Sequence, residues 1–173
     1  MKRLILLLLI LLVVAVGCSK DKKEIAGLPA ENGNPAPDFS LSGPNGETRL
    51  STLKGKLVLV HFWATWCPPC REELPSLAKL NKEMEGKPFR LLAISIDKEG
   101  NDAVQKLFSG LGITLPVLLD SSSRVAGQYG TTGVPETFIV SPEGIIIKKI
   151  VGSIEWSSPE VISFLNNAMK TGH

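Results

Sequence analysis

The sequence predicts a three-layer α/β domain with a mixed central sheet, and three observations support this fold class. Residues 57–63 and 89–97 are apolar almost throughout, as in strands that are covered on both faces. Residues 68–85 lie between them and carry apolar side chains at helical spacing, which indicates a βαβ unit. Two strand patterns flank the turn sequence SPEG at 141–144, and this second hairpin makes the sheet mixed.

Turn and periodicity signals predict the remaining elements. The sequence GPNG at 43–46 separates strand patterns at 38–42 and 47–50, which predicts an N-terminal β-hairpin. After the strand at 89–97, we expect a helix at 102–111, a strand at 115–119, a short helix at 123–129 and the hairpin strands at 137–140 and 145–151. A last helix opens at 157–160, where Pro159 suits a first helical turn and Ser157 with Glu160 has capping-box spacing.

The composition excludes two classes of protein. Apolar residues make up 43% of the 173 residues, which is enough for a core and excludes bulk disorder. The formal net charge is +2, and Lys2 and Arg3 supply both surplus charges, so basic and acidic residues balance from Ser19 onward. Such a neutral body gives no reason to expect a nucleic-acid partner, which normally needs a basic face.

The N-terminal 18 residues have the pattern of an export signal. A positive start precedes thirteen apolar residues at 4–16, a run that is short against the roughly 20 residues of a membrane span but typical of a signal peptide. The sequence AVGC at 15–18 resembles a bacterial lipobox, with Ala15 where that pattern prefers Leu. The resemblance implies lipidation of Cys18 and attachment to a membrane through the lipid anchor. An uncleaved N-terminal anchor is the alternative.

The predicted domain organisation follows from this signal and from the composition behind it. Residues 19–34 are polar and contain Gly, Pro and Asn, which is typical of a flexible tether. The folded domain is placed at 35–173. The expected location is therefore extracytoplasmic, on the membrane surface.

The chemistry-bearing motif is Cys67-Pro68-Pro69-Cys70, at the junction between a buried strand and a helix. A C-x-x-C at this junction indicates a redox pair, because the positive end of the helix stabilises a thiolate and the second sulfur lies within reach of the first. We assign Cys67 as the nucleophile and Cys70 as the resolving cysteine. A structural disulfide usually closes a longer loop, and a metal site needs more ligands than His61 and His173 offer, so no metal or cofactor is predicted.

The two prolines bear on the direction of electron flow. Pro69 has no N–H, so among the donors at the second and third helical positions only the amide of Cys70 can bond a sulfur at the N-cap. We expect a modest lowering of the pKa of the Cys67 thiol. A less stabilised thiolate disfavours the dithiol form, which indicates a fairly reducing pair.

Three segments resemble the thioredoxin-like proteins of the ResA/TlpA/DsbE type. They are FWATWCPPCREELP at 62–75, GVPETF at 133–138 and APDFSL at 36–41, in the order the family has them, and the resemblance runs from about 35 to 170. It implies a thioredoxin fold with an added N-terminal β-hairpin and a central strand-helix insertion. It also implies membrane-tethered thiol–disulfide exchange with a protein disulfide, in many members that of an apocytochrome c, and electrons from a membrane thiol-transfer donor.

The resemblance also implies roles for individual residues. Pro135 matches the family's cis-proline, which faces the disulfide, and Val134 would offer its backbone to a bound peptide. Glu73 matches an acid that can exchange a proton with Cys70, although a solvated helix position is an equal alternative. Glu136 is a candidate substrate contact or an edge residue. Trp66 is expected on the active-site surface and Trp63 in the core.

His61 departs from the family pattern. It lies six residues before Cys67, where thioredoxins have a buried Asp and this subfamily often has Asn. We expect a neutral side chain with satisfied hydrogen bonds, and the alternative is a titrating group that tunes the cysteines.

Three other functions remain as alternatives. A disulfide-forming oxidase is disfavoured by the proline argument. A peroxiredoxin-like peroxidase would have Thr three residues before its reactive Cys, where this chain has Ala64 and places Thr65 one residue too late. A copper chaperone of the Sco type needs C-x-x-x-C and a distal His, whereas the spacing here is two residues and His61 is the one candidate for that His.

Overall fold

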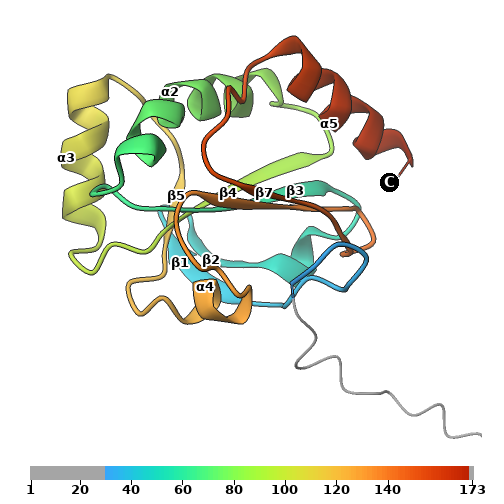
Figure 1. Cartoon of the computed structure of the whole chain (residues 1–173), viewed down its shortest axis with the longest axis horizontal. Coiled ribbons are helices and arrows are strands. Elements are labelled where there is room, and N and C mark those ends of the chain that lie inside the picture. The colour runs from blue at the N-terminus through green and yellow to red at the C-terminus, as the bar shows by residue number, and fades with distance from the viewer. Residues whose placement is uncertain (1–29, 172–173) are drawn as a thin grey trace, which may run out of the picture.

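The computed structural model describes residues 30–171, which form five strands in one sheet, a separate hairpin and four α-helices (Figure 1). The elements are β1 Ser40–Gly43, β2 Gly46–Arg49, the 3₁₀ turn η1 Leu50–Leu53, β3 Leu57–Trp63, α2 Pro68–Glu83, β4 Phe89–Ser95, α3 Asn101–Leu111, β5 Val117–Leu119, α4 Arg124–Gln128, β6 Glu136–Val140, β7 Ile146–Val151 and α5 Pro159–Thr171. The sequence prediction recovers each element except η1.

The sheet has the strand order β5-β4-β3-β6-β7. Strands β3, β4 and β5 are parallel, whereas β6 and β7 run antiparallel to their neighbours, so the sheet is mixed as the sequence predicts. Helices α2 and α5 cover one face, and α4 and the β1–β2 hairpin cover the other (Figure 1). This is a thioredoxin-like fold with an N-terminal two-stranded hairpin. The predicted fold class is confirmed.

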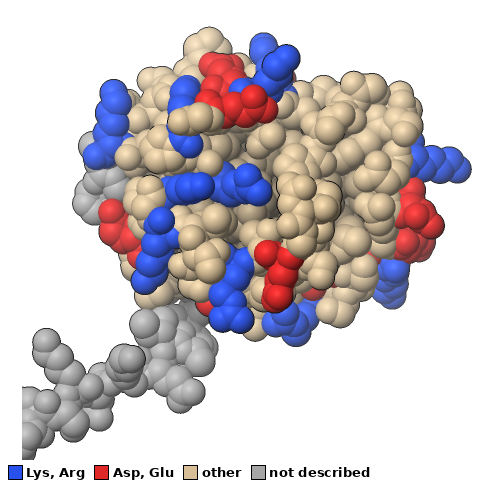
Figure 2. Space-filling view, turned by 180° about the vertical axis from the view of Figure 1, so that it is seen from behind, with Lys and Arg blue, Asp and Glu red and all other residues tan. Residues whose placement is uncertain are grey.

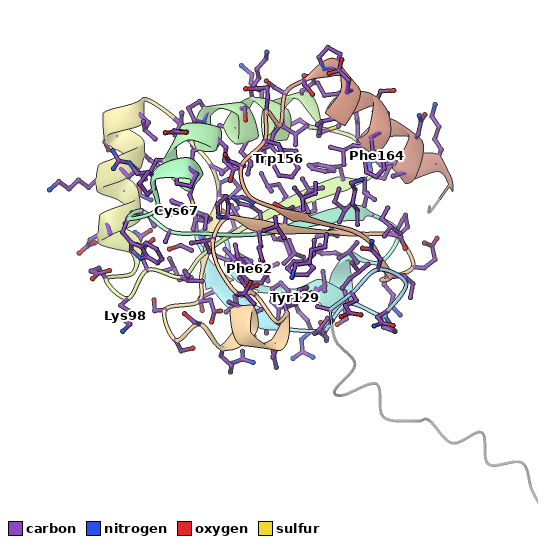
Figure 3. All side chains as sticks on the ribbon, viewed as in Figure 1. Phe62, Cys67, Lys98, Tyr129, Trp156 and Phe164 are labelled. Atoms are coloured by element: carbon purple, nitrogen blue, oxygen red, sulfur yellow. A yellow bond between two sulfur atoms is a disulfide. The ribbon has the colours of Figure 1, made fainter. Side chains whose placement is uncertain are left out.

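The central strand β3 divides the core into two halves. Leu57, Leu59 and Trp63 belong to the cluster under α2 and α5, where Trp63 stacks on Phe108 at 5.6 Å between ring centroids. Val58, Val60 and Phe62 belong to the opposite cluster, in which Phe62 packs against Tyr129 (Figure 3). This alternation follows from the period of two in a strand. It places His61, an odd-numbered residue, on the face that α2 and α5 cover.

Two differences from the sequence prediction have a local structural cause. Strand β4 ends at Ser95, two residues earlier than predicted, because the Asp97 amide donates to Ser95 Oγ and turns the chain. The cap of α5 is Ser158, whose hydroxyl accepts from the Val161 amide at 3.3 Å, so the predicted capping box at Ser157 is wrong by one residue.

The end of the predicted tether packs against the domain. Ala30 is buried, and the amide of Gly33 donates to Ile146 O at 2.8 Å. The folded part therefore includes residues 30–34. The predicted signal segment, Cys18 and the remainder of the tether lie outside the described residues. Within 30–171, no helix has both the length and the apolarity to cross a membrane.

The surface charge agrees with the balanced composition. Basic and acidic side chains both occur on the face seen from behind (Figure 2). This distribution fits the formal balance of charge from Ser19 onward.

Candidate active site

Cys67 and Cys70 form a disulfide at the carboxyl end of β3, where helix α2 begins. Cys67 is the N-cap residue, with the extended backbone that this position requires, and its Sγ accepts from the Cys70 amide at 3.3 Å. Pro68 and Pro69 occupy the first two helical positions and offer no amide hydrogen. The single amide donor that the sequence predicts for the Cys67 sulfur is the one that the structure shows.

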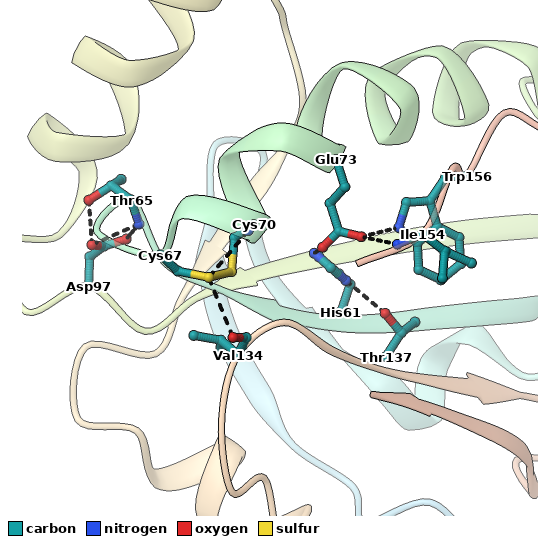
Figure 4. Close-up of a disulfide and its surroundings, with 10 residues drawn as sticks. All are labelled: His61, Thr65, Cys67, Cys70, Glu73, Asp97, Val134, Thr137, Ile154 and Trp156. Carbon is teal, nitrogen blue, oxygen red and sulfur yellow. Dashed lines mark hydrogen bonds and ion pairs between the residues drawn. A yellow bond between two sulfur atoms is a disulfide. The ribbon is translucent and has the colours of Figure 1, made fainter. Parts of the chain in front are cut away.

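The two sulfurs differ in their surroundings. Cys70 is fully buried, whereas Cys67 retains a 3% exposed fraction. Cys67 Sγ also lies 3.4 Å from the carbonyl oxygen of Val134, on the loop that leads into β6 (Figure 4). The Val134–Pro135 peptide bond is cis. The C-x-x-C motif and the loop before β6 therefore meet at the disulfide, through a contact between residues 67 positions apart in the chain.

Trp66 provides an apolar surface beside Cys67. Its side chain is 63% exposed, which is unusual for tryptophan among the described residues, since Trp63 and Trp156 are completely buried. An exposed indole next to a redox sulfur is suited to contact an incoming polypeptide.

The segment that carries Trp66 is held by a buried carboxylate. Asp97, which follows β4, accepts from the Thr65 amide at 3.1 and 3.0 Å and from the Thr65 hydroxyl at 2.6 Å. It also accepts from Ser95 Oγ at 2.7 Å. These bonds fix the residues immediately before Cys67. Sequence reasoning missed this role of Asp97, for which the one available signal was a carboxylate at the end of an apolar run.

Glu73 lies one helical turn after Cys70, on the inward face of α2. Its Oε2 accepts from Trp156 Nε1 at 2.7 Å and from the Ile154 amide at 3.3 Å. The side chain is buried, and this burial raises the pKa of the carboxyl to about 7, although the two hydrogen bonds act in the opposite direction. The solvated alternative considered from the sequence does not apply to this residue.

His61 lies on β3 beneath Glu73 (Figure 4). Its Nδ1 is 2.8 Å from Thr137 Oγ1, and its Nε2 is 3.6 Å from Glu73 Oε1. Complete burial lowers the pKa of His61 to about 3, so the ring is neutral near pH 7. The prediction of a neutral histidine fits this environment, but only one of its two nitrogens has a hydrogen-bond partner.

Glu136 does not face the surface beside the disulfide. Its carboxylate is 1% exposed, pairs with Lys149 Nζ at 3.2 Å and accepts from the amide and hydroxyl of Thr132. These internal partners hold the Glu136 carboxylate inside the fold, beside the loop that precedes β6.

Two further residues of this site carry no signal in the sequence. Thr137 reaches His61 because β6 pairs with β3, in a register that sets the two residues opposite each other. Trp156 reaches Glu73 from a loop 83 residues further along the chain. Neither contact follows from local spacing.

The fold and the paired cysteines at a helix N-terminus define a thiol–disulfide oxidoreductase. Residues 32–149 match the model of the AhpC/TSA family, which is more than half of the chain. The protein belongs to this family, and within it the chain is of the ResA/DsbE type.

Comparison with individual proteins supports this assignment. The chain is 34% identical over 149 residues to the thiol-disulfide oxidoreductase ResA of Bacillus subtilis strain 168, which covers 85% of this chain and 83% of that protein. A crystal structure from Chlorobium tepidum, assigned as the thiol:disulfide interchange protein DsbE, is 27% identical with a TM-score of 0.72 and covers 80% of this chain and 98% of that one. The exposed lipoprotein thioredoxin of Streptococcus pneumoniae strain TIGR4 is 29% identical with a TM-score of 0.64, over 76% of this chain and 99% of that one.

Proposed function

We propose that the protein reduces disulfides of other proteins, with Cys67 as the attacking sulfur and Cys70 as the resolving sulfur. The observation that carries this assignment is the asymmetry of the pair. Cys67 sits at the helix N-cap beside the exposed Trp66, whereas Cys70 lies fully buried one turn inside the helix. A substrate disulfide therefore meets Cys67 first.

The proposed exchange has two steps. The Cys67 thiolate attacks one sulfur of the substrate disulfide, so that a mixed disulfide forms and the other substrate sulfur leaves as a thiolate. Cys70, after losing its proton, attacks Cys67 Sγ, which releases the second substrate thiolate and forms the Cys67–Cys70 disulfide. The two protons of the dithiol end on the two substrate thiols. A membrane thiol-transfer donor then returns two electrons to the protein.

Glu73 is the proposed proton partner of Cys70. The two residues are one turn apart on the same helix, and i,i+3 side chains on a helix are neighbours. A carboxyl with a pKa of about 7 is half ionised near neutral pH, which is the condition that favours general acid–base transfer. Glu73 would thus accept the thiol proton when Cys70 attacks.

The proposed substrate site is the surface formed by Trp66 and the loop at 134–135. The Val134 carbonyl faces the sulfur of Cys67, so an extended peptide that pairs with the Val134 backbone would present its own sulfur there. Trp66 would contact the side chains of that peptide. Pro135, which the family resemblance places opposite the disulfide, forms the cis peptide bond that follows Val134.

The reducing direction is supported by the capping geometry. A single amide donates to Cys67 Sγ, and the two prolines supply none, so the thiolate gains limited stabilisation. Equilibration of the chain in dithiothreitol or glutathione buffers measures the reduction potential. A value near about −270 mV supports a reductase, whereas a value near about −120 mV identifies an oxidant and overturns the direction proposed.

A peroxidase is not favoured. Thr65, the nearest threonine before Cys67, donates its hydroxyl hydrogen to Asp97 at 2.6 Å and so does not offer it to the Cys67 sulfur. Cys67 is moreover paired with Cys70 within one helical turn, which is an arrangement for dithiol exchange.

We further propose an extracytoplasmic location with a lipid anchor on Cys18. The support is the signal pattern at 1–18 and the similarity to a pneumococcal protein described as an exposed lipoprotein. Labelling cells that express the full chain with a fatty acid tests this, because a lipidated chain takes up the label. Cys18→Ser is the variant and Ser19→Ala the matched control. Loss of label and of membrane retention in Cys18→Ser alone supports the anchor. Membrane retention without label indicates an uncleaved N-terminal anchor instead.

An apocytochrome c is the substrate that the family resemblance favours. A disulfide-bonded peptide with the haem-attachment spacing C-x-x-C-H tests this preference against an unrelated protein disulfide of similar potential. Faster reduction of the haem-attachment peptide supports the assignment. Equal rates indicate a general disulfide reductase.

A further inference from the structure

We propose that His61 is a positioning residue that changes tautomer, and not charge, as Glu73 gains or loses a proton. The inference rests on the proton-transfer role proposed above for Glu73. It concerns a residue that departs from the family pattern, so it describes how this chain in particular handles the buried carboxyl.

Two buried polar atoms face each other at this point. Among the described residues, His61 Nε2 and Glu73 Oε1 are each buried without a hydrogen-bond partner, and they lie 3.6 Å apart. A shift of about half an ångström would bring them to ordinary hydrogen-bond distance. Since an unpaired buried polar group is unfavourable, the two atoms are expected to satisfy each other. One proton between them is needed for that bond.

The other oxygen of Glu73 shows where the carboxyl proton must lie. Oε2 accepts from both Trp156 Nε1 and the Ile154 amide, so a proton on Oε2 would meet two donors. A protonated Glu73 therefore carries its proton on Oε1, which is directed at His61 (Figure 4).

Thr137 allows the ring to adapt to either state of the carboxyl. A threonine hydroxyl both donates and accepts, and it lies 2.8 Å from His61 Nδ1. When Glu73 is protonated, Nε2 accepts from the carboxyl and Nδ1–H donates to Thr137. When Glu73 is ionised, Nε2–H donates to the carboxylate and Nδ1 accepts from the Thr137 hydroxyl.

The proton balance of the two states is simple. They differ by one proton, which is the carboxyl proton that Glu73 exchanges with Cys70. The ring holds one proton in both states, on Nδ1 in the first and on Nε2 in the second. In both states Glu73, His61 and Thr137 are hydrogen-bonded to one another, so the carboxyl can ionise without leaving one of these buried polar atoms unpaired.

The surroundings favour a neutral ring in both states. Trp156, in the loop after β7, packs edge to face on His61 with 6.1 Å between the ring centroids. Strand β6 contributes the Thr137 hydroxyl. Helix α2 contributes Glu73 and, one turn earlier, Cys70. Within residues 30–171, Glu73 is the charged group that the structure pairs with His61. Burial holds the pKa of His61 at about 3 and that of Glu73 at about 7, so the carboxyl titrates while the ring stays uncharged.

Nitrogen NMR of the two ring nitrogens tests the inference. The full chain, with His173→Gln to remove the second histidine signal, is titrated from pH 5 to pH 9 while the Glu73 carboxyl carbon is followed. We expect the nitrogen chemical shifts typical of a donor and of an acceptor to interchange between Nδ1 and Nε2. The interchange should have the same pH midpoint as the titration of Glu73. An unchanged tautomer, or a ring that becomes cationic over this range, overturns the inference.

Two variants sharpen the test. Glu73→Gln places an amide donor opposite Nε2, so the ring should remain in the Nδ1–H tautomer at every pH. Thr137→Val removes the acceptor for Nδ1–H at nearly constant volume, so the Nε2–H tautomer should dominate and the Glu73 midpoint should fall by about one pH unit. A tautomer change that persists in Glu73→Gln, or an unshifted midpoint in Thr137→Val, contradicts the inference.

These readouts are separate from the proposed function. The ring signals report on His61 whether or not the chain reduces a protein disulfide. If the tautomers interchange but the reduced chain fails to reduce disulfides, the proposed function fails and the inference about His61 holds. If the chain reduces disulfides while the His61 tautomer stays fixed, the proposed function holds and the inference about His61 fails.

Discussion

Replacing Glu73 by Gln should change how the stability of the protein depends on pH. Gln has nearly the same shape, can still accept from Trp156 Nε1 and does not titrate. In the folded protein the pKa of Glu73 is raised from its ordinary 4.5 to about 7, mainly by burial. The unfolded chain therefore releases this proton at a lower pH than the folded protein does.

The sign and size of the effect follow from this difference. Between pH 4.5 and 7 the folded protein holds a proton that the unfolded chain has lost, so stability falls as the pH rises through this window. Above pH 7 Glu73 is ionised in the folded and in the unfolded chain, and the loss of stability is complete. At 1.36 kcal/mol per pH unit, the wild type should lose roughly 3 kcal/mol relative to Glu73→Gln between pH 4 and pH 8.

Urea unfolding of the disulfide form at a series of pH values measures this difference. Subtracting the two proteins cancels the other titrating groups, which they share. The free energy of unfolding of the wild type minus that of Glu73→Gln should fall steadily across the window. A difference that is constant with pH, or that grows as the pH rises, would refute the assignment of a raised pKa to Glu73.

Three more predictions concern contacts described above. Trp156→Phe removes the bond to Glu73 Oε2 and should raise the Glu73 pKa by about one to two units in a carbon NMR titration, whereas Trp66→Phe should leave it unchanged. Asp97→Asn weakens the bonds to Thr65 and should lower stability by about 1–3 kcal/mol in urea unfolding, and an unaltered midpoint would exclude its bracing role. Ser158→Ala should cost about 1 kcal/mol in the same assay through loss of the α5 cap, with Ser157→Ala near zero, and equal losses would contradict the cap assignment.

Much of the fold follows from local pattern. The uninterrupted apolar run of β3 identifies it as the central strand, and its alternation assigns each side chain to one of the two core clusters. The strand-to-helix junction likewise locates Cys67 at an N-cap, and the prolines identify Cys70 as the donor to its sulfur. These features depend on a few neighbouring residues, which is why sequence reasoning reaches them.

The parts that the sequence did not predict depend on contacts between distant segments. Trp156 meets Glu73 because of how the loop before α5 lies across α2, and no spacing encodes that path. Asp97 meets Thr65 because β4 and β3 end side by side. Glu136 follows Pro135 and is from sequence either a substrate contact or an edge residue, and only the fold shows that its side chain points inward and pairs with Lys149.

The cap of α5 shows a different kind of limit. Ser157 and Ser158 are adjacent and chemically alike, and both precede Pro159. The Ser157 hydroxyl donates to Glu155, which leaves Ser158 to accept from the Val161 amide. Local chemistry predicts that a cap exists here but does not choose between two neighbouring serines.

Trapping of a mixed disulfide tests the central claim most directly. The Cys70→Ser variant, reduced and mixed with a disulfide-bonded protein, keeps the nucleophile but lacks the resolving sulfur. We predict that it accumulates a covalent complex through Cys67 that dithiothreitol releases, and that the matched Cys67→Ser variant forms none. A complex that forms with Cys67→Ser and not with Cys70→Ser would contradict the assigned roles, and the absence of any complex with both would contradict thiol–disulfide exchange at this site.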